Sequence, residues 1–240
     1  KVFALADLHL SHQEDKPMAR FGRHWDNYEP KMMENCHREI GENDILLLPG
    51  DLSWALKPKN AVEDLKYIAS LPGHKVLLRG NHDYWWGTVS KNQRLVESLG
   101  LTGIYFLQTN AYRFHDDENA VIIVGTRGWL FPSDPLWKQD TDQRILDREV
   151  GRFKISLEEA EKMREEGDTV IAMTHFPPFD RTLEASEFTR MMTEAGVTDC
   201  VYGHIHHRES PFILQGHVLD DVRYHLVACD QIDFSPLRVL

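Results

Sequence analysis

Side chains that could bind metal ions or move protons follow short apolar runs along this chain. The clearest case is the run 76–78, which leads through Gly80 directly to Asn81, His82 and Asp83. β-favouring residues, a glycine and then an amide, an imidazole and a carboxylate are typical of a buried strand that delivers reactive groups at its carboxyl end. Four further apolar runs lead in the same way to Asp7 and His9, to Asp51, to His175, and to His204 and His206.

With His82 and Asp83 set aside, seven side chains remain as candidate metal ligands: two carboxylates, one amide oxygen and four imidazoles. Seven donors exceed the four to six that one transition metal takes, and the lack of a thiolate favours zinc, manganese or iron over a structural zinc site. Two metals that share a ligand fit the set better. Asp7 and His9 are two apart in a segment expected to be extended, which would point both side chains to one side, and His204 and His206 repeat this spacing.

The five motifs occur in the order Asp-x-His at 7–9, Gly-Asp at 50–51, Gly-Asn-His-Asp at 80–83, His175, and Gly-His-x-His at 203–206. In this the chain resembles the calcineurin-like metallophosphoesterase superfamily. The resemblance implies an α/β (α+β) fold, a four-layer α/β/β/α sandwich of two mixed sheets, with a dinuclear metal centre.

The resemblance also implies a role for each residue. Asp7, His9, Asp51 and His206 would hold one divalent metal, and Asp51 would bridge to a second one held by Asn81, His175 and His204. The two metals would be manganese, iron or zinc. A hydroxide bridging metals about 3.5–4 Å apart would attack a phosphomonoester or phosphodiester in line.

Two residues of the Gly-Asn-His-Asp motif are expected to act beside the metals. His82 is the candidate general acid, which would protonate the leaving alkoxide or stabilise charge on phosphorus. Asp83 would orient the imidazole of His82 and raise its pKa. The alternative for Asp83 is a cap of the local turn.

Candidate substrate-binding residues lie close to the metal motifs. Trp54 and Tyr84, like Trp85 and Trp86, could wall a pocket or pack in the core. Phe179 follows two prolines and is a candidate pocket wall. Arg127 could pair with phosphate or form a structural ion pair. His207 would point away from His206 in an extended run and is expected at the surface.

Composition limits the partners and the location of the protein. A net charge of −11 opposes nucleic-acid binding but is compatible with a small phosphorylated substrate. Three cysteines without a Cys-x-x-Cys pair predict buried thiols in a reducing cytoplasm. No apolar run approaches the roughly 18 residues of a membrane span. The sequence does not predict the oligomeric state.

Hydrophobic patterning predicts a single domain over residues 1–240 in which strands and helices alternate. Helices are expected at about 31–40, 58–70, 88–98 and 184–195, with one or two helical pieces over 140–166 whose inward face carries Leu157, Ala160 and Met163. Residues 11–30 are expected to form an irregular excursion. Strands are expected at 104–107, 111–114 and 120–126 with a hairpin turn at 115–119, which implies a second sheet or an antiparallel edge. Further short strands are expected over 212–240.

Two other functions compete with a phosphoesterase. One is a scaffold of the same fold that has lost catalysis, although a complete set of clustered carboxylates and imidazoles would be costly to retain without metal. The other is a nuclease of the same superfamily, which the acidic composition disfavours.

Overall fold

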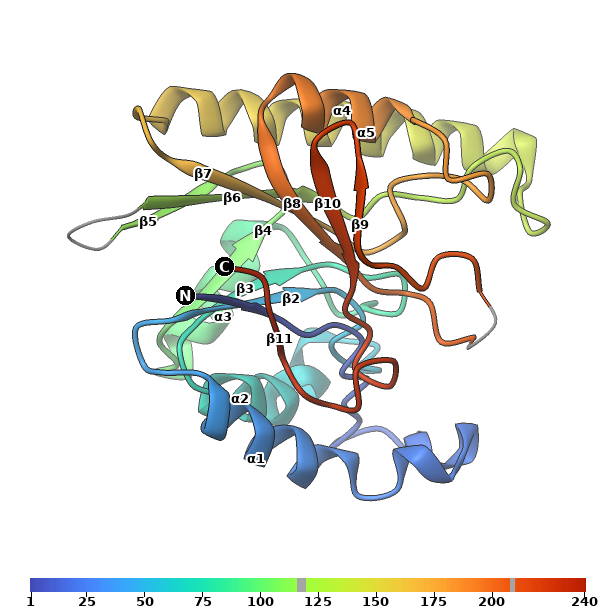
Figure 1. Cartoon of the computed structure of the whole chain (residues 1–240). Coiled ribbons are helices and arrows are strands. Elements are labelled where there is room, and N and C mark those ends of the chain that lie inside the picture. Colours follow the sequence, from blue (N-terminus) through green and yellow to red (C-terminus); the bar gives the residue numbers. More distant parts are fainter. Residues whose placement is uncertain (116–119, 208–209) are drawn as a thin grey trace. The chain divides into compact units, whose positions relative to one another are not determined.

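The computed structural model describes residues 1–115, 120–207 and 210–240. The chain divides into two compact units, a first unit of residues 1–106 and 227–240 and a second unit of residues 107–226. Each unit has its own sheet and its own helices (Figure 1). The predicted α/β class with two mixed sheets is therefore confirmed, while the single domain over 1–240 stays a prediction.

The sheet of the first unit is built around three parallel strands. β1 (Val2–Ala4) pairs with β2 (Ile45–Pro49), and β2 pairs with β3 (His74–Leu78). The antiparallel β11 (Leu237–Arg238) borders β1, and β4 (Ile104–Leu107) lies beside β3. Because β1, β2 and β3 are parallel, the segments that follow them leave the same edge of the sheet.

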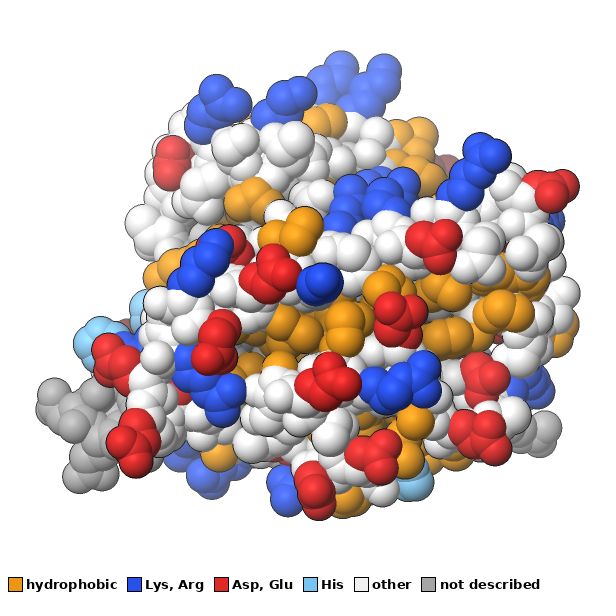
Figure 2. All heavy atoms as spheres, turned by 90° about the horizontal axis from the view of Figure 1, so that it is seen from above, with side chains coloured by type: hydrophobic (Ala, Val, Ile, Leu, Met, Phe, Trp, Pro, Cys, Tyr) orange, Lys and Arg blue, Asp and Glu red, His pale blue; other side chains and the backbone are white. Residues whose placement is uncertain are grey.

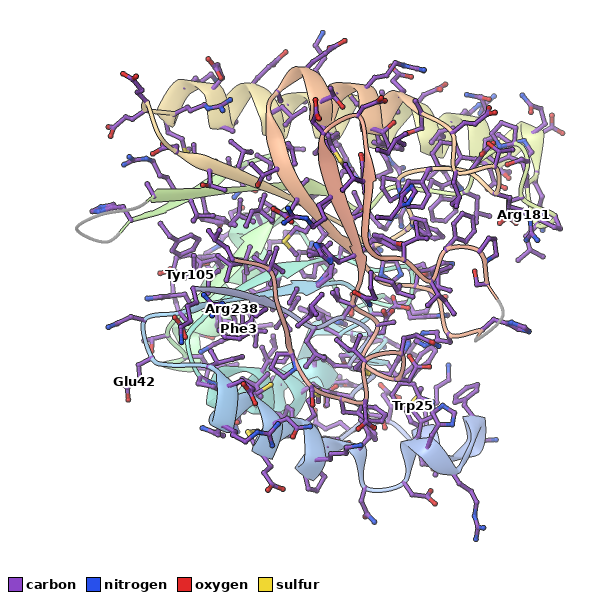
Figure 3. All side chains as sticks on the ribbon, in the orientation of Figure 1. Phe3, Trp25, Glu42, Tyr105, Arg181 and Arg238 are labelled. Atoms are coloured by element: carbon purple, nitrogen blue, oxygen red, sulfur yellow. The ribbon has the colours of Figure 1, made fainter. Side chains whose placement is uncertain are left out.

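Three helices cover one face of this sheet: α1 (Tyr28–Glu39), α2 (Val62–Ser70) and α3 (Val89–Ser98) (Figure 1). Their buried side chains form one apolar core with Phe3 of β1 and Trp25 (Figure 3). Thr88 caps α3 by accepting from the backbone N–H of Lys91. All three predicted helices of this unit are confirmed, with α1 beginning three residues earlier than expected.

The connections of the first unit contain short 3₁₀ helices. The expected excursion over 11–30 holds η1 (Met18–Phe21) and η2 (Arg23–Trp25), and the first turn of the helix expected at 58–70 is η3 (Pro58–Ala61). The excursion is therefore more ordered than predicted, because the buried Trp25 ring anchors it against Tyr28 and Phe234 at centroid distances of 5.1 and 5.3 Å.

His12 bridges two acidic side chains of the first unit. Its Nδ1 lies 2.7 Å from Asp64 Oδ1, and its Nε2 lies 2.8 Å from Glu29 Oε2. Ser53 Oγ donates to the other oxygen of Asp64. Partial burial lowers the pKa of His12, but the charge of Glu29 and the hydrogen bond to Asp64 outweigh it and raise the pKa above the usual value. The cluster fastens the segment before α1 to α2 and to the loop after β2.

Replacing His12 by alanine is expected to destabilise the protein by about 1 kcal/mol at acidic pH and by less at alkaline pH. Since the folded state raises the pKa of His12, its stabilisation is complete below the unfolded value of 6.5 and is lost as pH rises through the folded value. Urea unfolding of both proteins at about pH 5.5 and about pH 8.5 measures the difference. An equal or larger effect at the alkaline pH would contradict this role. Replacement of the exposed His37 on α1 is the control and should show no such trend.

The second unit contains a six-stranded mixed sheet. Its four inner strands run parallel to one another, and each of the two edge strands pairs antiparallel with its neighbour. The expected hairpin is confirmed as a strand pair, and its turn residues 116–119 lie outside the described residues. In spatial order the strands are β5 (Tyr112–His115), β6 (Ala120–Thr126), β7 (Thr169–Thr174), β8 (Val197–Tyr202), β10 (Val222–Leu226) and β9 (Gln215–Leu219).

Two helices cover one face of this second sheet, α4 (Gln139–Met163) and α5 (Glu187–Glu194) (Figure 1). α4 is one continuous helix, where the sequence allowed two pieces. Its buried residues are Asp142, Glu149, Phe153, Ser156 and Ala160. Ala160 thus lies inward as expected, whereas Leu157 and Met163 are only half-buried. None of the helices in the described part of the chain has the length and apolar composition needed to cross a bilayer. The three cysteines are buried free thiols, as predicted.

Candidate metal centre

The first group of predicted ligands lies at the carboxyl ends of β1, β2 and β3. The ladder between β1 and β2 continues past the strands, because the N–H of Asp7 donates to Gly50 O at 3.0 Å and the N–H of His9 donates to Asp51 O at 2.9 Å. Ligand atoms of Asp7 and His9 lie within 4.8 Å of each other. Asn81 follows the end of β3. The parallel strands thus deliver the ligands of the first unit to one edge, as predicted.

The backbone at these ligands differs from the expectation. Asp7, His9 and Asp51 have φ angles of 60°, 47° and 50°, so Asp7 and His9 are left-handed rather than extended. This conformation is strained for residues with a Cβ, and it persists where surrounding contacts over-determine it. The continued backbone hydrogen bonds provide those contacts. Strain at three ligand positions is typical of a functional site.

Buried carboxylates and imidazoles meet in this group. Asp7 and Asp51 are 0% and 1% exposed. Asp51 Oδ2 lies 3.9 Å from His9 Nε2 and 4.0 Å from His82 Nε2, and Asp51 Oδ1 accepts from the backbone N–H of His82 at 2.8 Å. Burying carboxylates in this way is costly unless positive charge compensates them. The donor set therefore fits divalent cations.

Gly80 permits the close approach of β3 to Asp51. A Cβ at Gly80 would lie 2.1 Å from Asp51 Oδ1 and 2.2 Å from the Asp51 nitrogen. The second atom is backbone and cannot rotate away. A glycine is therefore required here for packing rather than for a positive φ angle.

Replacing Gly80 by alanine is expected to displace Asp51, to lower the free energy of unfolding by about 1–3 kcal/mol and to weaken metal binding. Chemical denaturation and metal analysis measure the two effects. The matched control is Gly151→Ala in α4, where a Cβ meets nothing within 4 Å. That replacement should stabilise the protein by about 0.5–1 kcal/mol. Equal effects of the two replacements would refute the steric argument.

Asp83 anchors the loop that carries Asn81 and His82. Its carboxylate accepts hydrogen bonds from the backbone N–H groups of Leu52, Ser53 and Gly80 and from the indole of Trp85, at 2.7–3.1 Å. Complete burial and the negative charge of Asp51 raise its pKa. These bonds fit the turn cap, the alternative that the sequence left open. A direct role of Asp83 beside His82 stays a prediction.

The aromatic residues near these motifs separate into different roles. Trp54 is buried, and its ring stacks on His9 at 4.8 Å and lies 4.3 Å from the ring of His82. Trp85 and Trp86 belong to the core. Tyr84 is 58% exposed and lines, with Trp54, a cavity of about 220 Å³. Trp54 thus supports the imidazoles of His9 and His82. Contact of Trp54 or Tyr84 with substrate stays a prediction.

Sequence reasoning missed one neighbour of Trp54. The ammonium of Lys16 lies 3.2 Å from the centroid of the Trp54 ring, and burial together with the charge of Arg20 lowers the pKa of Lys16. Lys16 lies in the polar excursion before α1, and no sequence spacing relates it to Trp54.

The second group of predicted ligands follows β7 and β8. The N–H of His175 donates to Arg127 O, and the N–H of Gly203 donates to His175 O, so the ends of β6, β7 and β8 stay in register. The rings of His175 and His204 are 5.1 Å apart, with ligand atoms within 4.8 Å. His175 is buried, while His204 and His206 are half-buried. His204 has a φ angle of 71°, so it is left-handed and not extended as expected. The exposed His207 confirms the prediction for that residue.

Two candidate substrate residues of the second unit are held by protein contacts. Arg127 Nη2 lies 3.5 Å from Glu149 Oε1, and its guanidinium covers the ring of Trp129 at 4.4 Å. This fits the structural ion pair that the sequence left open. Phe179 is 1% exposed, and its ring packs edge-on against the ring of Tyr202 at 5.7 Å. The substrate roles of both residues stay predictions.

Comparison with known proteins identifies the family. A family model described as calcineurin-like phosphoesterase matches residues 1–208, so the chain belongs to this family and the resemblance is confirmed. Comparison with curated protein sequences finds no significant match.

Solved structures of low sequence identity share the fold. Phosphopantetheinyl hydrolase from Mycobacterium tuberculosis is 15% identical with a TM-score of 0.56, over 95% of this chain and 88% of that chain. TT1561 of Thermus thermophilus is 10% identical with a TM-score of 0.56, over 85% and 80%. GAP50, the anchor in the inner membrane complex of Plasmodium, is 13% identical with a TM-score of 0.51, over 95% and 71%.

Proposed function

We propose that this protein is a dinuclear metal-dependent phosphoric ester hydrolase. One divalent cation is held by Asp7, His9, Asp51 and His206, and the other by Asn81, His175 and His204, with Asp51 as the shared ligand. The observation that carries the proposal is the burial of Asp7 and Asp51 beside imidazoles, at the end of a sheet in a chain of this family. The second unit supplies imidazoles at the corresponding ends of its own parallel strands.

The bound cations supply Lewis-acid chemistry, because divalent metals neutralise phosphate charge and lower the pKa of water. The chain supplies the proton and the alignment. His82 is partly exposed, its backbone N–H is fixed by Asp51, and its ring lies against Trp54. From this position His82 acts as the general acid that donates a proton to the leaving oxygen. Asp83 keeps the loop of His82 in place through the backbone.

Oxygen and imidazole donors suit manganese, iron or zinc. The substrate is a small phosphorylated molecule, a monoester or a diester, because a net charge of −11 opposes binding of a polyanion. We place this activity in the cytoplasm, where three buried free thiols would stay reduced. A solved structure of the same fold is a phosphopantetheinyl hydrolase, which is consistent with such a substrate.

The test combines metal analysis with a substrate screen. Purified protein is expected to carry about two equivalents of transition metal and to hydrolyse at least one ester in a panel of phosphomonoesters and phosphodiesters supplied with manganese, iron or zinc. Protein that binds none of the supplied metals and stays inactive across the panel would overturn the proposal. Salt-sensitive binding and cleavage of DNA would instead support the nuclease.

A scaffold without catalysis is the second candidate, because a structure of the same fold is described as an anchor in a membrane complex. Full metal occupancy without hydrolysis of any ester in the panel would favour this candidate.

A further inference from the structure

A pocket of the second unit is lined by the loops that follow β6, β7 and β8. The loop after β6 contributes Trp129, Leu130 and Phe131, the loop after β7 contributes Phe176 and Phe179, and the loop after β8 contributes His204. Loops at the carboxyl ends of parallel strands are where α/β sheets bind ligands. We call these six residues the aromatic pocket.

The aromatic pocket begins at a proposed metal ligand. The ring of His204 lies 4.1 Å from the ring of Phe176, which in turn lies 5.0 Å from the ring of Trp129. A phosphate bound at the cation that His204 ligates would therefore have the aromatic pocket as its neighbour.

The lining of the aromatic pocket suits an uncharged, apolar group. Phe176 and Phe179 are buried, and Trp129, Leu130 and Phe131 are half-buried although they lie on a loop. Several half-buried apolar side chains in succession on a loop form a surface whose burial by an apolar ligand is favourable. Four polar residues also contribute to the lining: Ser133, Asp134, Asp180 and Arg181. Figure 3 labels Arg181 on the loop that follows β7.

The volume limits the size of the occupant. The cavity measures about 60 Å³. Since about 10–15 Å³ of such volume holds one water, there is room for roughly four to six non-hydrogen atoms. A phenyl ring or a branched alkyl group fits, whereas a nucleoside does not.

A neighbouring cavity is less suited to a phosphate ester. It measures about 310 Å³, shares Phe131 with the aromatic pocket, and extends between the starts of α4 and α5. Asp147, Glu184 and Glu187 line it, and these carboxylates would repel an anion. Figure 2 shows apolar side chains flanked by acidic and basic ones on the face that carries α4 and α5. Of these two cavities, the aromatic pocket is the one that combines a mainly apolar lining with a proposed metal ligand.

We infer that the aromatic pocket binds an apolar organic group, of phenyl or branched-alkyl size, esterified to the substrate phosphate. The inference rests on the proposed phosphoesterase function. It makes Phe131, Leu130 and Trp129 residues that determine specificity, and it predicts preference for phosphate esters whose apolar group is separated from the ester oxygen by one or two carbons.

The test compares 2-phenylethyl phosphate with ethyl phosphate, each as the monoester and as its methyl diester. The two alcohols are leaving groups of nearly equal acidity, so a difference in kcat/KM between the two esters measures the contribution of the aromatic pocket. The phenylethyl ester is expected to be preferred roughly 10- to 200-fold, the range for apolar discrimination in a pocket. Phe131→Ala should bring this ratio towards one. Leu136→Ala, on the same loop but 74% exposed and outside the pocket lining, should leave it unchanged.

A second readout does not depend on turnover. Calorimetric binding of 2-phenylethylphosphonate and ethylphosphonate to the metal-loaded protein should show the same preference and the same loss in Phe131→Ala. Equal kcat/KM values for the two esters would overturn the inference and leave the proposed function intact. Hydrolysis of neither ester would count against the proposed function. The inference about the aromatic pocket would then be tested by phosphonate binding alone, and equal binding of the two phosphonates would overturn it.

Discussion

Replacement of Asp51 by asparagine is expected to abolish phosphoesterase activity by emptying the metal centre. Asp51 is the proposed shared ligand, and its buried carboxylate supplies negative charge that an amide does not. Removing a residue that only hydrogen-bonds to a metal ligand lowers metal affinity by about 10- to 100-fold. Loss of a shared ligand itself should therefore lower metal affinity by at least about 100-fold. Metal analysis after dialysis and calorimetric titration with manganese measure this loss.

The replacement should leave the fold in place. Asparagine is nearly the same size as aspartate, tolerates the φ angle of 50° at this position, and can still accept the hydrogen bond from the N–H of His82 through its amide oxygen. Asp233→Asn is the matched control, because Asp233 has a φ angle of 53° in the same unit but forms an ion pair with Lys31 instead. Full metal occupancy in Asp51→Asn would contradict the shared-ligand assignment.

Replacement of His82 by alanine is expected to lower kcat by roughly 10²- to 10⁴-fold while both metals are retained. His82 contacts Asp51 and Trp54 but is not among the proposed ligands. A general acid matters most when the leaving alkoxide is basic, so the loss should be larger for an alkyl ester than for a 4-nitrophenyl ester. Steady-state kinetics on both esters and metal analysis of the same preparation provide the measurement.

Two results would remove His82 from this role. Turnover equal to that of the unmodified protein would show that no proton from His82 is needed. An equal loss on both esters together with loss of metal would show that His82 supports the site rather than the reaction. Trp54→Phe is a useful comparison, because it keeps an aromatic ring beside His82 and should retain most of the activity.

The position of the candidate ligands along the fold could be predicted from the sequence. Short apolar runs ending at Gly50, Gly80 and Gly203 identified β2, β3 and β8, and strands that run parallel end at the same edge. The period of apolar residues also identified the helices. These features depend on local chemistry and on a general property of parallel sheets, so one sequence is enough to predict them.

The conformation of the ligands could not be predicted in the same way. The left-handed backbone of Asp7 depends on hydrogen bonds to the loop at Gly50, more than forty positions away in the sequence. Likewise, the carboxylate of Asp83 accepts hydrogen bonds from the backbone N–H groups of Leu52 and Ser53. Nothing in the sequence next to Asp83 indicates these partners. Partners that are distant along the chain decide such details.

The aromatic residues show the same limit. Trp54, Tyr84 and Trp85 all follow metal motifs, yet the first supports two imidazoles, the second is exposed and the third is in the core. Residue type alone does not distinguish these environments. The continuous α4 also follows from packing, because its buried face meets β6 along the helix.

The most direct test of the dinuclear centre is diffraction from manganese-loaded crystals, with anomalous scattering recorded at the manganese edge. Two peaks are predicted, one in contact with Asp7, His9 and His206, the other with Asn81, His175 and His204, and both touching Asp51. No peak among these side chains, or one ion whose ligands leave out half of them, would contradict the account.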